Sequence, residues 1–476
     1  MSEPKDEKPR RGSPTPAPKD EKPRRSSPTP APKGKKPRRS SRVPTGRLER
    51  LARVGLLAGE LAAGGVAEGV RRVTGGRREG GFFVTEANAQ RLVKRLAGMR
   101  GAAMKLGQLL SMEGEDLLPP EVSDALALLR NDGDCMPPQQ LRRVLGHAWG
   151  KGWQERFTSF DFEPIAAASI GQVHQACSLD GRSLALKIQY PGVAKSTASD
   201  VDNLAAVLRM SRLLPSDVEI APLIEEAKRQ LRQEADYEAE ARHLRHYGAL
   251  LADASFFRVP AVHDDFTTRH VLAMDRLEGL PLEDLCGNDH SQQRRDQVGR
   301  ALLELLLREL FEFRFSQTDP NIANYLWLEE GRIGLLDLGA ARDVPEPVSR
   351  NYARLCRAGM DRDRTALEEA ALGLGVLPPD ETPERRRAVL DFVELVAEPF
   401  HHEGIYDFGV SDLPRRAREA ATRLAFRHGF RSPPPPEILF LQRKLGGTFL
   451  QCARLRARID VRRLLEETFE RLRIAA

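Results

Sequence analysis

The sequence predicts an α+β protein in which a small β-rich lobe is followed by a larger lobe built mainly from helices. Two short segments of alternating character, residues 171–178 and 183–189, flank an Asp180-Gly181 pair, a pattern typical of a β-hairpin. Most of the remaining chain repeats apolar residues at three- and four-residue spacing, which predicts helices. With 476 residues, 41% of them hydrophobic and 30% charged, the chain can form two or three soluble domains.

The first 45 residues form a tail of distinct composition. A Lys-Pro-Arg-Arg motif returns with a period of 14, and the tail holds 11 prolines and few large apolar residues. Such a segment cannot offset the entropy cost of ordering by burying apolar surface, so we expect it to be disordered. Its 14 Lys or Arg against 5 Asp or Glu give a net charge of +9. We interpret the tail as a solvated spacer, and an electrostatic contact with anionic lipid or nucleic acid is the alternative interpretation.

Without the tail, residues 46–476 hold 60 Lys or Arg against 63 Asp or Glu, a net charge of −3. This balance argues against a nucleic-acid-binding domain, which should carry a basic surface of its own. The five cysteines lie far apart without a Cys-x-x-Cys pair, which excludes a zinc ribbon or a disulfide framework. No segment approaches the ~20 apolar residues of a spanning helix, so we expect a cytoplasmic protein without a transmembrane segment, with at most peripheral membrane contact.

Residues 46–156 are predicted to form an N-terminal helical extension. Apolar residues at helical spacing predict a helix over residues 85–112. Near its end stand Lys105 and Gln108, three residues apart and therefore on one helix face. A further short helix is expected from Pro137-Pro138 to about residue 149.

Residues 157–278 are predicted to form the small lobe. After the hairpin, helical periodicity covers residues 197–214 and 222–251, and an apolar strand is expected over residues 270–274. A hinge is expected at residues 278–281. The larger lobe, residues 279–476, is predicted to be mainly helical, with interruptions at residues 315–324 and an apolar strand at 333–336.

Five residues, in this order along the chain, point to phosphoryl-group chemistry. Lys187 ends a predicted strand and can neutralise the α- and β-phosphates of a nucleotide, while a helix downstream offers Glu240 to orient it. Asp319 and Asn324 stand at an Asp-x-x-x-x-Asn spacing, and Asp337 follows a predicted strand. Asp319 has the place of a catalytic carboxylate, and Asn324 with Asp337 offers the hard oxygens that Mg²⁺ prefers. The set predicts a kinase-like site that binds phosphate groups together with Mg²⁺.

The predicted phosphate loop departs from that of ordinary protein kinases. Where a Gly-x-Gly-x-x-Gly loop would bring bare backbone amides to the phosphates, this chain has Ala166-Ala167-Ala168-Ser169. Alanine restricts φ, so this loop cannot adopt conformations reserved for glycine. We include these four residues and Met274, at the end of the strand over residues 270–274, among the candidate nucleotide contacts.

These motifs resemble the UbiB family of atypical kinase-like proteins, most closely its coenzyme Q-associated branch. The motifs that carry the resemblance are Lys105-x-Gly-Gln108, the alanine-rich loop, Lys187, Glu234-x-Asp236 with Glu240, Gln317-Thr-Asp319-Pro-Asn321-x-x-Asn324 and Asp337-x-Gly339. Together they cover roughly residues 43–460. The resemblance implies a protein kinase-like two-lobed fold with a helical extension over the nucleotide site, binding of ATP or ADP with Mg²⁺, ATPase activity and support of ubiquinone biosynthesis.

The same resemblance assigns roles residue by residue. Lys187 would bind phosphates and pair with Glu240, Asp319 would take the catalytic-aspartate place, and Asn324 with Asp337 would hold the metal. Lys105 and Gln108 would cap the pocket where a protein substrate normally enters, with Lys105 near Glu234 and Asp236. Leu338 replaces the usual phenylalanine after the metal aspartate, and its side chain is expected to face the core.

Two classes of function remain open from the sequence. In the first, the protein is an enzyme that hydrolyses ATP or phosphorylates a small or lipid-like quinone precursor. In the second, it is a nucleotide-gated scaffold that organises quinone-biosynthesis enzymes. An ordinary protein kinase acting in trans is a weaker alternative, because the glycine loop and an evident activation segment are missing.

Overall fold

The computed structural model describes residues 135–210, 221–287, 289–428 and 435–474. Two compact units, Met1–Arg38 and Arg39–Ala476, divide the chain, and every described residue belongs to the second. The predicted basic tail and most of the predicted helical extension, including Lys105 and Gln108, lie outside the described residues. The limits proposed for the four segments of the chain therefore stay predictions.

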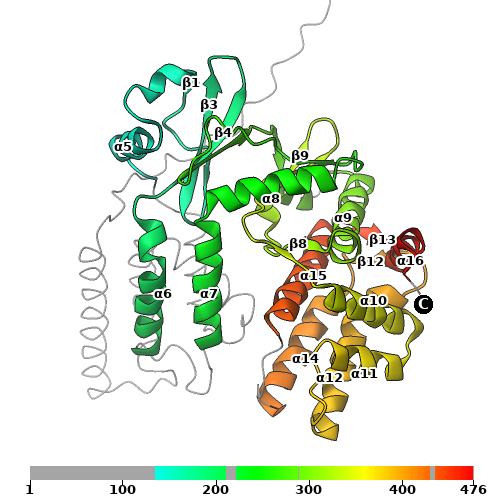
Figure 1. Ribbon diagram of the computed structural model, residues 1–476. Helices are drawn as coiled ribbons and strands as arrows, with labels where there is room; N and C mark the ends of the chain where they lie inside the picture. Colours follow the sequence, from blue (N-terminus) through cyan, green and yellow to red (C-terminus); the bar gives the residue numbers. More distant parts are fainter. Residues whose placement is uncertain (1–134, 211–220, 288, 429–434, 475–476) are drawn as a thin grey trace, which may run out of the picture. The chain divides into compact units, whose positions relative to one another are not determined.

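An antiparallel five-stranded sheet forms the first part of the described chain (Figure 1). Its strands are β1 (Phe157–Phe160), β2 (Ala166–Ala167), β3 (Gly171–Ser178), β4 (Ser183–Gln189) and β6 (Val271–Asp275). The order is β1-β3-β4-β6, with β2 pairing on β3. The predicted hairpin is confirmed, with β3 and β4 ending where the sequence predicts, because Gly181 turns the chain with a φ of +84° that glycine adopts without strain.

A short helix and an aromatic cluster close one end of this sheet. Helix α5 (Pro138–Trp149) and the 3₁₀-helix η2 (Trp153–Arg156) precede β1, and the former confirms the predicted helix after Pro137. Trp149 lies 5.4 Å from Phe157 and 6.1 Å from Phe266, measured between ring centroids, and its indole N–H donates to the Phe266 carbonyl at 3.0 Å. These contacts attach α5 to the strands and so hold the start of the described chain against the sheet.

Three helices follow β4: α6 (Val193–Met210), α7 (Ala221–Glu234) and α8 (Tyr237–Leu250). The continuous periodicity over residues 222–251 is divided in the structure, because α7 ends at Glu234 and α8 starts after Asp236. The Asp236 carboxylate accepts a hydrogen bond from the Ala239 amide at 2.9 Å, which caps the new helix. The break places Glu240 in the first turn of α8.

A second, four-stranded sheet has the order β5-β10-β9-β7. Its strands are β5 (Phe257–Arg258), β7 (Gly279–Pro281), β9 (Tyr325–Leu328) and β10 (Ile333–Leu335). The chain thus passes from α8 to β5 in the second sheet, returns to β6 in the first, and crosses again to β7. The residues expected to form a hinge pair as β7 with β9, where Gly279 lies against the Trp327 carbonyl.

Helices make up most of the remaining chain, as predicted (Figure 1). They are η3 (Leu282–Cys286), α9 (Gln292–Leu307), η5 (Ile322–Asn324), α10 (Glu346–Asp361), α11 (Arg364–Gly373), α12 (Pro383–Val396), α13 (Glu398–His401), α14 (Leu413–His428), α15 (Pro436–Leu455) and α16 (Val461–Leu472). A π-helical segment, η4 (Arg308–Phe313), directly continues α9. Two short ribbons complete the fold: β8 (Phe315–Gln317) with β11 (Ala341–Asp343), and β12 (Tyr406–Asp407) with β13 (Arg458–Ile459). The predicted α+β class is confirmed.

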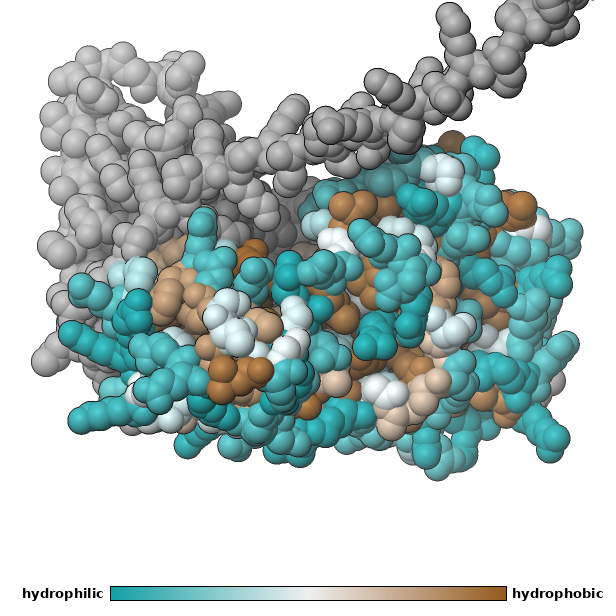
Figure 2. All heavy atoms as spheres, turned by 90° about the horizontal axis from the view of Figure 1, so that it is seen from above, coloured by the Kyte–Doolittle hydropathy of each residue, from teal (hydrophilic) through white to brown (hydrophobic). Residues whose placement is uncertain are grey.

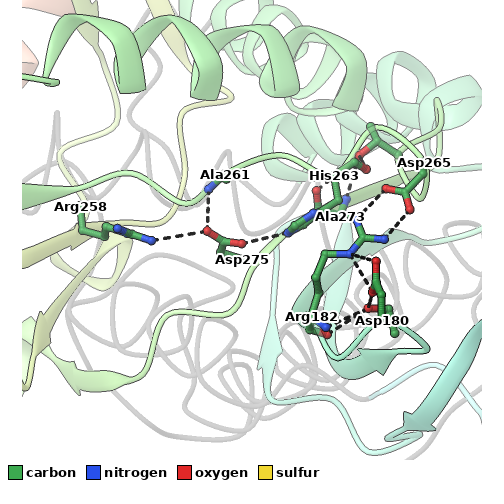
Figure 3. A network of polar contacts seen from close by, with 10 residues as sticks. Asp180, Arg182, Arg258, Ala261, His263, Asp265, Ala273 and Asp275 are labelled. Carbon is green, nitrogen blue, oxygen red and sulfur yellow. Dashed lines mark hydrogen bonds and ion pairs between the residues drawn. The ribbon is translucent and has the colours of Figure 1, made fainter.

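A network of polar contacts links the β3–β4 turn of the first sheet to the segment before β6 (Figure 3). Arg182, in the β3–β4 turn, binds Asp265 through two nitrogens at 2.7 and 3.1 Å, and it also contacts Asp180. His263 lies 2.9 Å from Asp275 of β6. These contacts join the hairpin turn to the segment before β6, and they join that segment to β6 itself.

The surface seen from above mixes apolar and polar residues in small groups (Figure 2). The most exposed large apolar side chains of the described residues are Val410, at 82% exposure, Leu179 at 67% and Ile405 at 66%. In the described part of the chain, no helix combines the length and apolar character needed to cross a membrane.

Candidate functional site

Three of the predicted site residues meet at one ammonium group. Lys187 points from the middle of β4, where the strand pairs with β3 on one side and β6 on the other. Its Nζ lies 2.8 and 2.9 Å from the two carboxylate oxygens of Glu240 and 3.0 Å from Asp337 Oδ2. These partners come from α8 and from the segment between β10 and β11. The fold therefore assembles Lys187, Glu240 and Asp337 as the motif predicts.

The two carboxylates differ in their environment. The Glu240 side chain is 1% exposed, whereas the Asp337 side chain is 35% exposed. Burial raises the pKa of Glu240, and the neighbouring ammonium of Lys187 opposes this rise. Burial also lowers the pKa of Lys187, but Asp337 and Glu240 more than offset it and leave the pKa well above its ordinary value. Lys187 thus stays a cation throughout the neutral range.

The segment with Asp319 and Asn324 lies next to the one with Asp337. The backbone of Gln317 pairs with Ala341 between β8 and β11, and the Leu336 amide donates to the Asn324 carbonyl at 2.9 Å. Asn324 Nδ2 lies 3.3 Å from the Asp319 carbonyl oxygen, so the side-chain oxygen of Asn324 points away from that carbonyl. Leu338 is 2% exposed, so the expectation that it faces the core is confirmed.

The alanine-rich loop forms a narrow turn. Ala166 and Ala167 pair with β3 as strand β2, and the Ala168 amide donates to the Gly171 carbonyl at 2.9 Å. The Ser169 hydroxyl donates to Glu234 at the end of α7. The loop is thereby attached to the Glu234-x-Asp236 motif, whose Asp236 caps α8. Met274 lies in β6 opposite Ala185 and is 5% exposed.

One buried tyrosine of this region was not identified from the sequence. Tyr237, the first residue of α8, is 0% exposed, and its ring centroid lies 5.4 Å from Lys187 Nζ. Its hydroxyl forms no hydrogen bond within the described part of the chain. A Cβ atom on Gly171 would lie 2.8 Å from this hydroxyl and 2.4 Å from the Ile188 carbonyl, so the glycine allows close approach of backbone and tyrosine. Its position between Asp236 and Glu240 is the sequence feature that could have identified Tyr237.

The described residues offer two oxygen ligands for a metal at this site. Among the described residues, no group of three or more His, Cys, Asp or Glu side chains is placed to hold a metal ion. Asn324 and Asp337 supply an amide and a carboxylate oxygen, and Mg²⁺ is commonly bound by one or two such groups together with substrate phosphates. The donor set therefore fits Mg²⁺ bound with a nucleotide.

The chain matches the ABC1 atypical kinase-like domain over residues 128–371. It is 42% identical over 430 residues to the mitochondrial atypical kinase COQ8B of Rattus norvegicus, covering 89% of this chain and 81% of the relative. It is 36% identical over 430 residues to the mitochondrial atypical kinase COQ8 of Saccharomyces cerevisiae, covering 89% and 85% of the two chains.

A solved structure shows the same fold. The complex of Rv3197 with erythromycin from Mycobacterium tuberculosis matches with a TM-score of 0.56 and 25% sequence identity, over 80% of this chain and 95% of the other. The domain match, the high coverage of the COQ8 relatives and the kinase-like fold agree with the motifs assembled around Lys187. The chain belongs to the UbiB family, the proteins with an ABC1 atypical kinase-like domain.

Proposed function

We propose that this protein binds ATP or ADP together with Mg²⁺ and hydrolyses ATP or transfers its terminal phosphoryl group to a small or lipid-like acceptor. The observation that carries this proposal is the position of Lys187, whose ammonium lies within 3.0 Å of both Glu240 and Asp337. A strand lysine held by a helix glutamate, next to a metal-binding aspartate, is the arrangement that kinases use around nucleotide phosphates.

Each residue has a defined task in this proposal. Lys187 contacts the α- and β-phosphates while Glu240 keeps its side chain extended. Asn324 and Asp337 would hold Mg²⁺, which neutralises phosphate charge. Asp319 orients the attacking hydroxyl or water and accepts its proton. Met274 and the loop from Ala166 to Ser169 are proposed nucleotide contacts.

The site is chemically suited to an anionic ligand in two further respects. The ammonium of Lys187 retains its charge because of the carboxylates around it. The buried hydroxyl of Tyr237, near Gly171, donates no hydrogen bond to the described residues and could donate one. Asp337 is the more exposed of the two partners of Lys187, so it can turn toward a metal while Glu240 keeps hold of the lysine.

The acceptor we propose is a quinone precursor, and the pathway is ubiquinone biosynthesis. Support comes from the COQ8 relatives and from the coenzyme Q-associated motif Gln317-Thr-Asp319-Pro-Asn321. Contact with quinone-biosynthesis enzymes and peripheral binding to an anionic membrane belong to the same proposal. A cytoplasmic location stays a prediction, since the names of the relatives state that those proteins are mitochondrial.

Calorimetric titration with ATP, with and without Mg²⁺, tests the site. Asp337→Asn should weaken Mg²⁺-dependent ATP binding by about 10- to 100-fold, because it removes a charged metal ligand. Asp361→Asn, which changes an exposed aspartate at the end of α10, is the matched control and should bind like the unmodified protein. Equal affinity of the Asp337→Asn and unmodified proteins in the presence of Mg²⁺ would contradict the assignment.

A further inference from the structure

A buried polar cluster lies behind the segment that carries Asp319. Lys444, in α15, is 2% exposed, and its Nζ lies 3.0 Å from Glu309 Oε2. Glu309, in the π-helical segment η4, is 0% exposed and also accepts hydrogen bonds from the hydroxyls of Tyr247 and Ser316, at 2.9 and 3.0 Å. A buried ion pair is tolerated when further hydrogen bonds satisfy its atoms, and both oxygens of Glu309 are satisfied in this way.

Lys444 makes a second contact that has consequences for the catalytic segment. Its Nζ lies 3.3 Å from Oε1 of Gln317. An ammonium group can only donate hydrogen bonds, so it selects the oxygen of the Gln317 amide and turns the NH₂ group the other way. That NH₂ group donates to the Asp319 carbonyl at 2.6 Å and lies 3.5 Å from the Asp337 carbonyl, at the limit of a hydrogen bond.

The Gln317 side chain therefore lies between the two segments that carry Asp319 and Asp337. If the amide were reversed, its oxygen would face the carbonyl oxygens of both aspartates and its NH₂ group would face Lys444, so every contact would be repulsive. The Gln317 backbone is also held, because its N–H donates to the Tyr247 hydroxyl at 2.7 Å. Lys444 on one side and the two carbonyl groups on the other therefore fix which way this amide points.

Neighbouring residues of α15 support the same segment. Gln451 Nε2 donates to the Pro320 carbonyl at 2.7 Å, and Gly447 lies so close that a Cβ atom would be 2.3 Å from Pro320 Cβ. Lys444, Gly447 and Gln451 are spaced three and four residues apart and share one helix face. This face of α15 lies along residues 317–320, and Lys444 is its only charged member among these three.

We propose that Lys444 is a positioning residue for phosphoryl transfer: it orients the Gln317 amide and so sets the distance between Asp319 and Asp337. This inference rests on the proposed function, because the two aspartates act on ATP and Mg²⁺ only if the site binds them. Lys444 would act through Gln317 rather than by direct contact with ATP or Mg²⁺.

Two variants separate positioning from simple stabilisation. Lys444→Met combined with Glu309→Gln removes both charges, so no unpaired buried charge remains, but the Gln317 oxygen then loses its cationic donor and only the two carbonyl groups hold the amide. Gln317→Glu keeps an oxygen for Lys444 and places a second oxygen against the two carbonyl groups. Val389→Ala, which shortens a buried side chain of the separate core cluster between α10, α11 and α12, is the control for loss of stability.

The measurements are ATP turnover at saturating Mg²⁺ and hydrogen–deuterium exchange of the nucleotide-free protein. Both test variants should lower kcat about 10- to 100-fold, as expected for groups that orient a catalytic centre, while KM changes by less than about threefold. Exchange should increase in both segments, residues 315–324 and 336–343. The control should melt at a lower temperature but keep its kcat and its protection in these segments.

The outcomes distinguish this inference from the proposed function. Unchanged kcat and unchanged exchange in both test variants would overturn the role of Lys444. An unmodified protein that neither binds nor hydrolyses ATP would refute the proposed function instead. In that case the exchange measurement, which needs no nucleotide, still decides whether Lys444 holds the two aspartate segments together.

Discussion

Lys187 shares its ammonium between two carboxylates, and these two are not equivalent. Glu240 is buried and binds with both oxygens, whereas Asp337 is more exposed and uses one, its other oxygen accepting from the Gly339 amide at 3.0 Å. Breaking a buried pair by removing one partner costs about 3–5 kcal/mol, because an uncompensated charge remains. Phosphate groups that bind Lys187 would therefore compete with Asp337 rather than with Glu240.

His174 is the residue for which the structure gives a clear dependence on pH. The Met136 amide donates to Gln172 Oε1 at 2.8 Å, so the NH₂ group of Gln172 donates to His174 Nε2 at 2.7 Å. His174 Nδ1 then carries the proton and donates to the Asp161 carbonyl at 2.8 Å. A second proton on the ring would face the Gln172 NH₂ group, and burial lowers the pKa of His174 below its ordinary value.

We predict that acid destabilises the protein partly through His174. A histidine with a lowered pKa contributes stability above its unfolded pKa of 6.5, and this contribution is lost as the pH falls through the folded pKa. The melting temperature of the unmodified protein should therefore fall more between pH 7.5 and pH 5.5 than that of His174→Asn. His147→Asn, at an exposed position of α5, is the control and should keep the full slope. An identical slope in all three proteins would exclude the mechanism.

At the scale of elements, the sequence predicts local structure well where a turn residue marks the boundary. Gly181 defines the ends of β3 and β4, and Pro138 opens α5 as expected. The sequence does not predict the division between α7 and α8, because the apolar periodicity continues across Asp236. The new helix starts there because the Asp236 side chain caps it, and this capping bond depends on one residue. Local sequence alone does not decide between a capped break and a continuous helix.

The candidate site shows the same limit of prediction. The order of the motifs was enough to predict one site that contains Lys187, Glu240 and Asp337, because each of these residues belongs to a short motif of the family. Lys444 carries no such pattern: it follows Arg443 in a helix with other charged residues, and its partners, Glu309 and Gln317, are distant in the sequence. The contact of Lys444 with Gln317 becomes visible only when α15 packs on residues 317–320, since tertiary pairs of this kind leave no periodic pattern in the sequence.

Two adjacent glycines of α15 provide a matched test of that packing. Gly447→Ala should destabilise the protein by about 1–3 kcal/mol and lower ATP turnover, because the new methyl group would displace Pro320 and with it Asp319. A Cβ atom on Gly446 would meet nothing within 4 Å, so Gly446→Ala should leave turnover unchanged and stabilise the helix by about 0.5–1 kcal/mol. Thermal unfolding and turnover of the two variants decide the matter, and equal behaviour would count against the packing argument.

The alanine-rich loop gives a second prediction for an element. Ala168 closes the turn against Gly171, and glycine at this position opens φ values that alanine does not reach cheaply. Ala168→Gly should therefore change nucleotide affinity, or permit self-phosphorylation, measured by calorimetry and by incorporation of labelled phosphate. Ala252→Gly, in an exposed turn after α8, is the control. If Ala168→Gly behaves like this control, loop conformation does not limit the reaction.

At the scale of the whole molecule, charge is unevenly distributed along the chain. The tail of residues 1–45 has a net charge of +9, while residues 46–476 have a net charge of −3. Electrostatic attraction to an anionic surface acts over roughly one Debye length, about 8 Å at physiological salt, and each basic residue near the surface contributes about 1 kcal/mol.

Deleting residues 1–45 should weaken binding to anionic liposomes and leave ATP turnover unchanged. Cosedimentation with vesicles that contain phosphatidylserine, at low and high salt, measures the effect. Zwitterionic vesicles serve as the control, since they offer no net charge to the tail. Salt-insensitive binding that is equal with and without the tail would show that other residues make the membrane contact.

The chain passes three times between the two sheets. The α8–β5, β5–β6 and β6–β7 connections join the two parts at three points, so any relative motion of the sheets must bend all three. Helix α8 is tied to the second part of the chain through Tyr247 with Glu309 and His243 with the Leu338 carbonyl. Because α8 and the Asp337 segment are linked in this way, a separation of the first sheet from them would withdraw Lys187 from Glu240 and Asp337 together. If the site binds a nucleotide as we propose, its exchange would then be governed by how readily one ammonium leaves two carboxylates, and an incoming polyphosphate would lower that barrier only by replacing Asp337.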